Sequence, residues 1–356
     1  MQSLPLTQFP KILLIRFSSL GDIVHALSVP FAIRTKWPTA KIYWLVRSDL
    51  QDLLLSHPLL EKVVACDRRL SFFGLIRLAV ELSNEGFTHV YDAHSSLRSE
   101  IVCWVLRVMN LLNRDSRQPE FLVRPKDRLK RLFLFMFRIN WFPHPFKGVL
   151  SYLRPLEKWG MDSTRPPGDH FHLREGISLP EEIKQFLSSG NQPLAIVPSA
   201  AWEMKRWPVA YWKELVLSLQ SERFLVLGGP EDQFCEDIAR VAPNRVLNCA
   251  GKTTLQESAL LLARSWLTIS ADTGLLHVAD QMEKPCIALI GPTAFGYPTS
   301  KSSIVLETQL HCKPCTKDGS GRCRNLEYQK CLLELTPSKV SELVLKLRAQ
   351  RVLNSS

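Results

Sequence analysis

The chain has 356 residues, of which 46% are hydrophobic and 22% are charged, and these are ordinary values for a globular protein. Its length suits two domains better than one, and its composition excludes a disordered, collagenous or disulfide-dense protein. The net charge of +11 is uneven, because residues 1–175 hold 25 basic and 16 acidic residues whereas residues 176–356 hold 20 and 18. The first half is therefore expected to face an anionic partner.

Apolar runs alternate with helical patterns along the first half of the chain. This alternation predicts a parallel sheet with helices on both faces. Strands are expected at residues 11–17, 40–46, 63–65 and 88–92. Helices are expected from the turn at Gly21 to near Lys36, and at residues 75–84 and 99–112.

The same alternation of apolar runs and helical patterns begins again after a Pro/Gly-rich stretch at residues 165–168. Strands are expected at residues 194–197, 223–227, 245–248, 266–270 and 286–290. Helices are expected at residues 181–188, 209–220, 231–241, 255–264 and 275–281, followed by an amphipathic helix at 337–351. The sequence thus predicts an α/β protein with two doubly wound, Rossmann-like domains, at 1–175 and 176–336, and a final helix and tail at 337–356. Ligands bind at the carboxyl ends of such sheets, so an active site is expected in a cleft between the domains.

Cellular location is predicted from what the sequence lacks and from its cysteines. No apolar run approaches the roughly 18–20 residues of a membrane span, and the start of the chain, MQSLPLTQFP, has no basic residue typical of a signal peptide. Nine cysteines, an odd number, favour a reducing compartment. A cytoplasmic protein is expected. Motifs of nucleic-acid-binding proteins are absent from the sequence, so no nucleic-acid partner is expected.

Three motifs follow predicted strands and precede predicted helices. The first, SSLGD at residues 18–22, places Asp22 at a helix start, where it is either a capping acid or a general base. The second, SAAWEMKRWP at residues 199–208, sets a Lys-Arg pair between two tryptophans, either as a phosphate site or as a solvated basic loop. The third, SADTGLLH at residues 270–277, offers free backbone N–H groups to a phosphate at a helix start.

In their order and spacing these motifs resemble the bacterial ADP-heptose:lipopolysaccharide heptosyltransferases, which form one glycosyltransferase family. The resemblance rests on LIRFSSLGDIVHALSVP, VPSAAWEMKRWP and ISADTGLLHVADQMEKPCIALIGPT, and it extends over most of residues 11–345. It implies a GT-B fold and an inverting transfer of heptose from ADP-L-glycero-D-manno-heptose to the lipopolysaccharide inner core. It also implies that the reaction needs no catalytic metal or other cofactor.

The resemblance assigns acceptor chemistry to the first half of the chain. Asp22 matches the family's general base, which removes the proton from the attacking hydroxyl. Arg68 and Arg69 resemble a basic pair that contacts the anionic, lipid-anchored core acceptor. His94 stands where relatives often have Gln.

Donor binding is assigned to the second half in the same way. Lys205 matches the lysine that neutralises the leaving diphosphate, and Asp272 matches the acid that contacts the donor sugar. Thr273 and Gly274 match donors of hydrogen bonds to the diphosphate, and His277 matches the histidine of the same loop. A lysine and a helix start are chemically suited to a leaving ADP, because both stabilise developing negative charge.

Other functions remain open on the sequence alone. A nucleotide-sugar epimerase, a protein heptosyltransferase or a non-catalytic sugar-nucleotide-binding protein would use the same scaffold. Loss of Asp22 separates an enzyme from a binding protein, because it should abolish transfer by the enzyme and leave a pure binding protein unaffected.

Two further segments have alternative interpretations. Cys312, Cys315, Cys323 and Cys331 have a spacing that would suit a structural zinc site, or they are reduced thiols in a surface loop. Residues 124–146 combine six basic residues with the apolar run 132–137. This segment is either a core element with solvated charges or a peripheral contact with an anionic membrane at its inner face.

Overall fold

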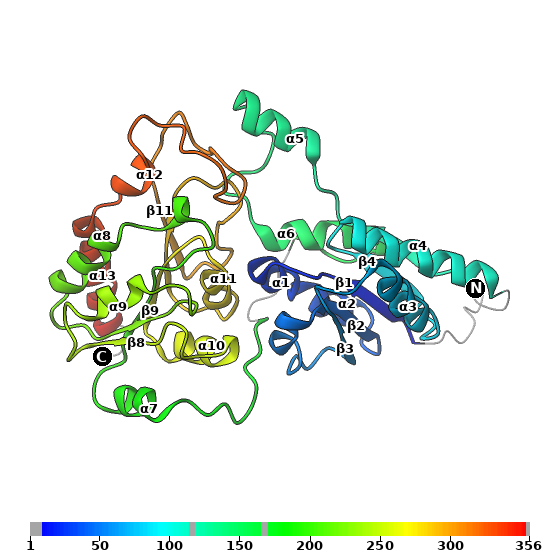
Figure 1. Ribbon diagram of the computed structural model, residues 1–356, viewed down its shortest axis with the longest axis horizontal. Helices are drawn as coiled ribbons and strands as arrows, with labels where there is room; N and C mark the ends of the chain where they lie inside the picture. Colours follow the sequence, from blue (N-terminus) through cyan, green and yellow to red (C-terminus); the bar gives the residue numbers. More distant parts are fainter. Residues whose placement is uncertain (1–8, 114–117, 165–169, 354–356) are drawn as a thin grey trace. The chain divides into compact units, whose positions relative to one another are not determined.

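The computed structural model describes residues 9–113, 118–164 and 170–353 (Figure 1). The stretch predicted to separate the domains, residues 165–168, lies outside the described residues. The chain forms two compact units: Met1–Asp127 with Gly148–Glu175, and Arg128–Lys147 with Gly176–Ser356. The first unit therefore consists of two stretches of chain, and the stretch between them packs with the second unit.

The first unit is built on a five-stranded parallel sheet in the order β3-β2-β1-β4-β5. Its central strand pairs on both sides, so that Ile15 lies opposite Leu45 in one neighbour and Asp92 in the other. The four inner positions Ile12 to Ile15 are buried, as expected for a continuous apolar run covered on both faces. The strands are β1 (Lys11–Ile15), β2 (Lys41–Arg47), β3 (Lys62–Cys66), β4 (His89–Asp92) and β5 (Glu120–Val123).

Helices cover both faces of this sheet (Figure 1). Helices α3 (Phe72–Ser83) and α4 (Leu97–Leu112) pack against each other and share one core with the sheet. Helices α1 (Leu20–Ala26), α2 (Ser28–Lys36) and α6 (Gly148–Leu153) also pack together. Short 3-10 helices occupy Ser48–Leu53 (η1) and Arg154–Trp159 (η3).

The close approach of α1 and α6 depends on a glycine. A Cβ atom at Gly148 would lie 2.6 Å from the ring of His25, so only glycine lets the first turn of α6 reach α1. This contact matters for the site, because α6 holds Tyr152 and α1 holds Asp22.

The second unit is a six-stranded parallel sheet in the order β11-β10-β9-β6-β7-β8. The strands are β6 (Leu194–Val197), β7 (Phe224–Val226), β8 (Val246–Asn248), β9 (Leu267–Ala271), β10 (Cys286–Ile290) and β11 (Ser303–Glu307). Its helices are α7 (Glu181–Ser188), α8 (Val209–Ser218), α9 (Phe234–Ala239), α10 (Leu255–Arg264), α11 (Gly274–Gln281), α12 (Lys330–Leu333) and α13 (Pro337–Leu353), and a 3-10 turn, η4, spans Glu203–Lys205. Two all-parallel sheets covered by helices confirm the predicted fold class.

The final helix, α13, packs against α8 and contributes Val340 and Val344 to the core of the second unit. Its attachment is also electrostatic, because Arg348 donates two hydrogen bonds to Glu222, a carboxylate that is almost fully buried. The last helix of the chain is thus part of the second unit.

Some elements differ from the sequence expectation. The helix predicted between Gly21 and Lys36 is interrupted at Leu27, which joins α1 to α2. The edge strands β5 and β11 were not predicted, since each is short and partly exposed and so lacks a continuous apolar signal. Within the described residues, no helix is both long enough and apolar enough to cross a membrane.

Candidate active site

Asp22 lies in the first turn of α1, immediately beyond the end of β1. One carboxylate oxygen, Oδ2, accepts a hydrogen bond from Ser19 Oγ at 2.9 Å and lies 2.5 Å from Arg16 Nη2. The other, Oδ1, accepts a hydrogen bond from Tyr152 Oη at 2.8 Å. The carboxylate is therefore held at both oxygens, yet 39% of the side chain stays exposed and open to a substrate.

The charge of Asp22 is set by these neighbours. Burial of the carboxyl group would raise its pKa, but the Arg16 guanidinium opposes this and, with the Tyr152 hydroxyl and the charge of Arg124, holds the pKa of Asp22 well below its ordinary value. Asp22 is thus an ionised hydrogen-bond acceptor throughout the physiological pH range. The Ser19 backbone N–H approaches Oδ2 at 3.4 Å, as a helix cap requires. The contacts with Arg16 and Tyr152 are additional to that capping role.

The groups that hold Asp22 were not predicted from the sequence. Arg16 ends the buried strand run, and its Nη1 donates to the Ala93 carbonyl at 2.9 Å. Arg124 donates to the Ser151 carbonyl and hydroxyl at 3.2 and 2.7 Å and lies 4.0 Å from the ring centre of Tyr152. The only sequence signal for these groups was Arg16, a basic residue within the apolar run KILLIRF. A charge in a buried strand is tolerated only when it is paired.

The remaining residues expected on the acceptor side lie beyond other strands. His94 follows β4, and burial, with the charges of Arg16 and Lys126, lowers its pKa to about 4, so its ring is neutral at pH 7. Arg68 and Arg69 are exposed in the loop after β3, two strands away from β1 in the sheet. Their loop is ordered by Arg98, which donates to the carbonyls of Arg68 and Asp67, and by the Asp67 carboxylate, which accepts a hydrogen bond from the Arg69 backbone N–H.

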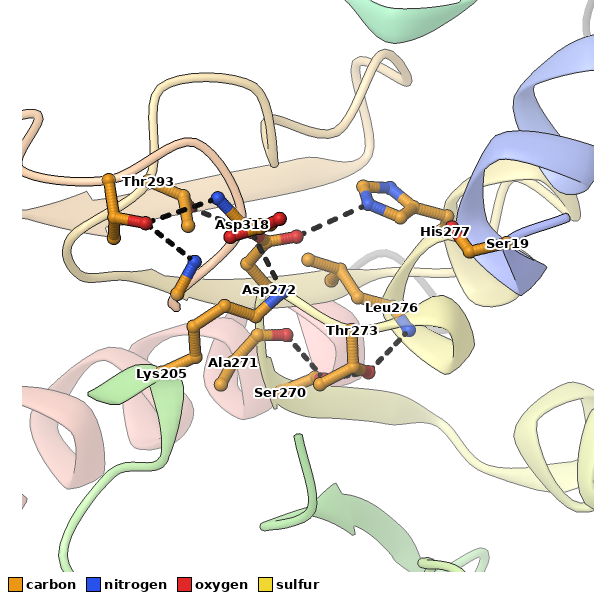
Figure 2. Close-up of polar contacts among 12 residues, drawn as sticks. Ser19, Lys205, Ser270, Ala271, Asp272, Thr273, Leu276, His277, Thr293 and Asp318 are labelled. Atoms are coloured by element: carbon orange, nitrogen blue, oxygen red, sulfur yellow. Dashed lines mark hydrogen bonds and ion pairs between the residues drawn. The ribbon is translucent and has the colours of Figure 1, made fainter. Parts of the chain in front are cut away.

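In the second unit, Asp272 is the centre of a compact polar cluster (Figure 2). Its Oδ2 accepts a hydrogen bond from Thr293 Oγ1 at 2.7 Å and lies 3.2 Å from Lys205 Nζ, and its Oδ1 lies 3.5 Å from His277 Nε2. Asp272 directly follows β9, Lys205 ends η4 after β6, and Thr293 follows β10, so the loops after three neighbouring strands supply the cluster. The structure thus brings together Lys205, Asp272 and His277, three of the residues that the resemblance assigned to donor binding.

Asp272 is almost completely enclosed. A Cβ at Gly296 would lie 2.0 Å from the Asp272 carboxyl carbon, so the loop after β10 can cover this carboxylate only because residue 296 is glycine. Burial would raise the pKa of Asp272, but Lys205, with His277 and Thr293, holds that pKa far below its ordinary value. Asp272 is therefore a fixed negative charge that orients the lysine ammonium.

Thr273 and Gly274 form the start of α11. Thr273 is the N-cap residue, and its Oγ1 accepts a hydrogen bond from the Leu276 backbone N–H at 3.4 Å. Gly274 is the first residue of the helix, so its backbone N–H has no acceptor within the helix itself. This end of α11 follows the buried strand β9, as is typical of phosphate sites in α/β proteins.

The two basic residues of the second motif have different roles. Lys205 reaches Asp272, whereas Arg206 donates to the Ala200 carbonyl at 2.9 Å and pairs with Asp232 at 3.5 Å. Arg206 therefore stabilises its own loop, and of the two basic residues Lys205 is the one that joins the cluster around Asp272. A Cβ at Gly319 would lie 2.6 Å from Lys205 Cγ, so the loop after β11 packs directly on the lysine stem.

Three of the four clustered cysteines, Cys312, Cys315 and Cys323, lie in that same loop, Cys331 lies in α12, and all four are free thiols. Among the described residues, no group of three or more His, Cys, Asp or Glu side chains is arranged to hold a metal ion, so the zinc hypothesis finds no support here. The loop is instead held by Gln329, whose Nε2 donates to the carbonyls of Glu203 and Arg206 at 2.7 and 3.2 Å. These bonds fix the turn that presents Lys205.

Comparisons with known proteins agree with this arrangement. Residues 169–323 match the profile of glycosyltransferase family 9 (heptosyltransferase). Lipopolysaccharide heptosyltransferase 1 of Pseudomonas aeruginosa is 26% identical over 86% of each chain. The lipopolysaccharide core heptosyltransferase OpsX of Haemophilus influenzae is 23% identical over 80% of each.

Solved structures show the same fold. A family 9 glycosyl transferase of Veillonella parvula superposes with a TM-score of 0.71 at 20% identity, covering 97% of this chain and 98% of that one. ADP-heptose lps heptosyltransferase II of Escherichia coli superposes with a TM-score of 0.68 at 21% identity, covering 96% and 99%. The two parallel-sheet units have the GT-B fold of these structures, and the match to the glycosyltransferase family model and to the curated heptosyltransferases identifies the protein as a glycosyltransferase. The similarity to family 9 over residues 169–323 and to the curated lipopolysaccharide heptosyltransferases agrees with the resemblance seen in the sequence motifs.

Proposed function

We propose that this glycosyltransferase transfers heptose from ADP-L-glycero-D-manno-heptose to the inner core of lipopolysaccharide, with inversion at the anomeric carbon and without a catalytic metal. The observation that carries the proposal is the ionised, doubly anchored Asp22 carboxylate at the start of α1. The choice of sugar and acceptor is supported by the relatives named lipopolysaccharide heptosyltransferases, which match the chain over most of its length.

Asp22 is the proposed general base. The acceptor hydroxyl donates a hydrogen bond to this carboxylate and attacks the anomeric carbon on the face opposite the diphosphate. The new C–O bond forms, the bond to the diphosphate breaks, and the hydroxyl proton passes to Asp22. A carboxylate with so low a pKa is a weak base, so the proton is expected to move late, after the attacking oxygen has become acidic.

Donor binding is assigned to the second unit. We place the diphosphate at the N-terminus of α11, where the backbone N–H of Gly274 and the hydroxyl of Thr273 are suited to bind its oxygens. Lys205, held by Asp272, neutralises the charge that develops on the leaving ADP. These groups supply the stabilisation for which other enzymes use a divalent cation, and this is the reason to expect activity without metal.

Acceptor binding is assigned to the first unit, which holds the proposed base Asp22 and has 20 basic and 16 acidic residues, a net charge of +4 that is compatible with an anionic core. Arg68 and Arg69 are exposed and are the proposed contacts with acidic groups of the acceptor. The acceptor is anchored in lipid, so the reaction is placed at the inner face of the cytoplasmic membrane. Nine free cysteines agree with that reducing compartment.

The test is mass spectrometry of lipid-anchored core acceptors after incubation with enzyme and ADP-heptose, with and without a chelator. The proposal expects a gain of one heptosyl residue that survives chelation, with the opposite anomeric configuration to that of the donor by NMR. Asp22→Asn should slow the gain about 10²- to 10⁴-fold while leaving ADP binding by calorimetry unchanged.

Other outcomes would redirect the assignment. Loss of activity in chelator would reject the metal-free mechanism, and a product with the donor's configuration would reject inversion. Transfer to a protein but to no core acceptor would favour a protein heptosyltransferase. ADP-heptose binding without any product would favour a non-catalytic binding protein.

A further inference from the structure

The segment between β5 and α6 exposes apolar side chains that its sequence would allow in a core. It comprises α5 (Arg128–Leu132), a π-helical turn, η2 (Phe133–Phe137), and the residues that follow to Trp141. In the apolar run 132–137 only Leu134 is buried. The most exposed apolar side chains of the segment are Leu129 (70%), Met136 (62%), Phe137 (57%) and Trp141 (53%).

This exposure is imposed by specific contacts on the other side of the segment. Arg138 Nη1 donates to the Pro314 carbonyl at 2.5 Å, and Arg324 Nη1 donates to the Phe135 carbonyl at 3.1 Å. The ring of Phe135 packs edge-on against Phe295, with ring centres 6.2 Å apart. The segment is thus attached to the second unit along one side, and the exposed side chains lie on the part of its surface that these contacts leave uncovered.

Charge distinguishes this surface from an ordinary protein interface. Residues 128–147 contain five basic residues and no acidic one. Arg128 and Lys130 are exposed on α5 and flank Leu129. Apolar side chains bordered by lysine and arginine are typical of helices that lie in the interface of an anionic bilayer. The basic side chains then lie at the lipid head groups, and the apolar side chains lie just below them.

We infer that residues 128–141 form a docking surface for anionic lipid, through which the protein binds a membrane reversibly. Leu129, Met136, Phe137 and Trp141 enter the head-group boundary, and Arg128 and Lys130 pair with lipid phosphates. The surface is too short to span the bilayer and provides a peripheral contact. The inference concerns lipid binding only, so it holds or fails independently of the sugar transferred.

The test is flotation of the purified full chain with vesicles of phosphatidylcholine alone or mixed with phosphatidylglycerol. We expect binding to the mixed vesicles at low salt, weak binding to phosphatidylcholine, and release at high salt. Arg128→Gln with Lys130→Gln should lower the partition coefficient about 30-fold at low salt. Leu129→Ser with Met136→Ser should lower it about 10- to 100-fold at either salt concentration.

Matched controls come from the same unit. Lys184→Gln with Lys346→Gln removes two exposed charges from α7 and α13, and Leu217→Ser with Leu345→Ser removes two exposed apolar side chains from α8 and α13. Both controls should float like the unaltered protein. The thermal midpoint of every variant should match that of the unaltered protein, because the replaced side chains are exposed.

Three results would overturn the inference. The first is no flotation of the unaltered protein with anionic vesicles at low salt. The second is equal loss of flotation in the control and test variants, which would indicate nonspecific attraction of a basic protein. The third is unchanged flotation of the Leu129/Met136 variant with a change in its sedimentation, which would assign the surface to contact with a second copy.

Discussion

Replacement of Lys205 by Met tests the cluster around Asp272. Lys205 Nζ lies 3.2 Å from Asp272 Oδ2, and the two side chains are only 13% and 12% exposed. Met keeps the apolar stem that packs on Gly319 but removes the charge. The Asp272 carboxylate is then left with the Thr293 hydroxyl and with His277. Removal of one partner of a buried pair typically costs about 3 kcal/mol or more.

That loss has a measurable size and a defined dependence on pH. For a unit of this size, about 3 kcal/mol corresponds to a fall of about 6–12 °C in the thermal midpoint. In the unaltered protein the folded-state pKa of Asp272 is lowered, so its contribution is present above the unfolded pKa and is lost as pH falls through the folded value. In Lys205→Met the folded pKa rises, and the stability difference between the two proteins should therefore shrink as pH is lowered through the carboxyl range.

The assay is thermal unfolding, by calorimetry across a pH series, of the single variants Lys205→Met and Asp272→Asn and of the double variant. We expect the double variant to be more stable than the sum of the two single losses predicts, because it leaves no uncompensated charge. Lys184→Met is the matched control, since its pair with Glu181 is exposed and should contribute under about 1 kcal/mol. Additive losses, or a Lys205→Met loss that is independent of pH, would refute the reasoning.

Asp22→Asn should lower kcat about 10²- to 10⁴-fold. Because the pKa of Asp22 is held well below its ordinary value, the activity of the unaltered enzyme should not fall in mild acid through protonation of this group. A fall in activity that titrates near the ordinary carboxyl pKa would contradict the Arg16 contact. Arg68→Gln with Arg69→Gln should raise KM for the acceptor in a salt-dependent way and leave KM for ADP-heptose unchanged; an effect on the donor instead would remove both from the acceptor side. Gly296→Ala should weaken ADP binding in calorimetry and lower the thermal midpoint, because its Cβ would overlap the Asp272 carboxyl group; unaltered ADP affinity would show that the loop after β10 plays no part in the donor site.

Sequence reasoning located the two clusters through the positions of single residues. Asp22, Lys205 and Asp272 each follow a buried apolar run, and the carboxyl ends of parallel strands meet at one edge of a sheet. Thr293 was not among the residues predicted for the site; it lies in the Gly-Pro-Thr sequence that follows β10, 21 residues from the carboxylate that it contacts. A turn motif predicts backbone shape and carries no signal for the side chain to which its hydroxyl donates.

The fold class followed from the sequence because it depends on local periodicity. Runs such as ILLI at residues 12–15 and CIALI at residues 286–290 are continuously apolar, and this pattern is characteristic of strands buried on both faces, whatever the rest of the chain does. The edge strands β5 and β11 escaped prediction for the same reason, since half-exposed strands lose that continuity.

Only the tertiary structure determined which groups contact each carboxylate and how exposed the apolar run 132–137 is. Tyr152 comes 130 residues after Asp22 in the chain, and only the packing of α6 on α1 through Gly148 makes it a partner of that carboxylate. The run 132–137 has the composition of a core element, yet only Leu134 is buried and half of the run is exposed, because only one side of the segment is attached to the second unit. Periodicity along a chain records which residues are apolar, whereas the pKa of a carboxyl group and the exposure of a side chain depend on which distant segments pack beside them.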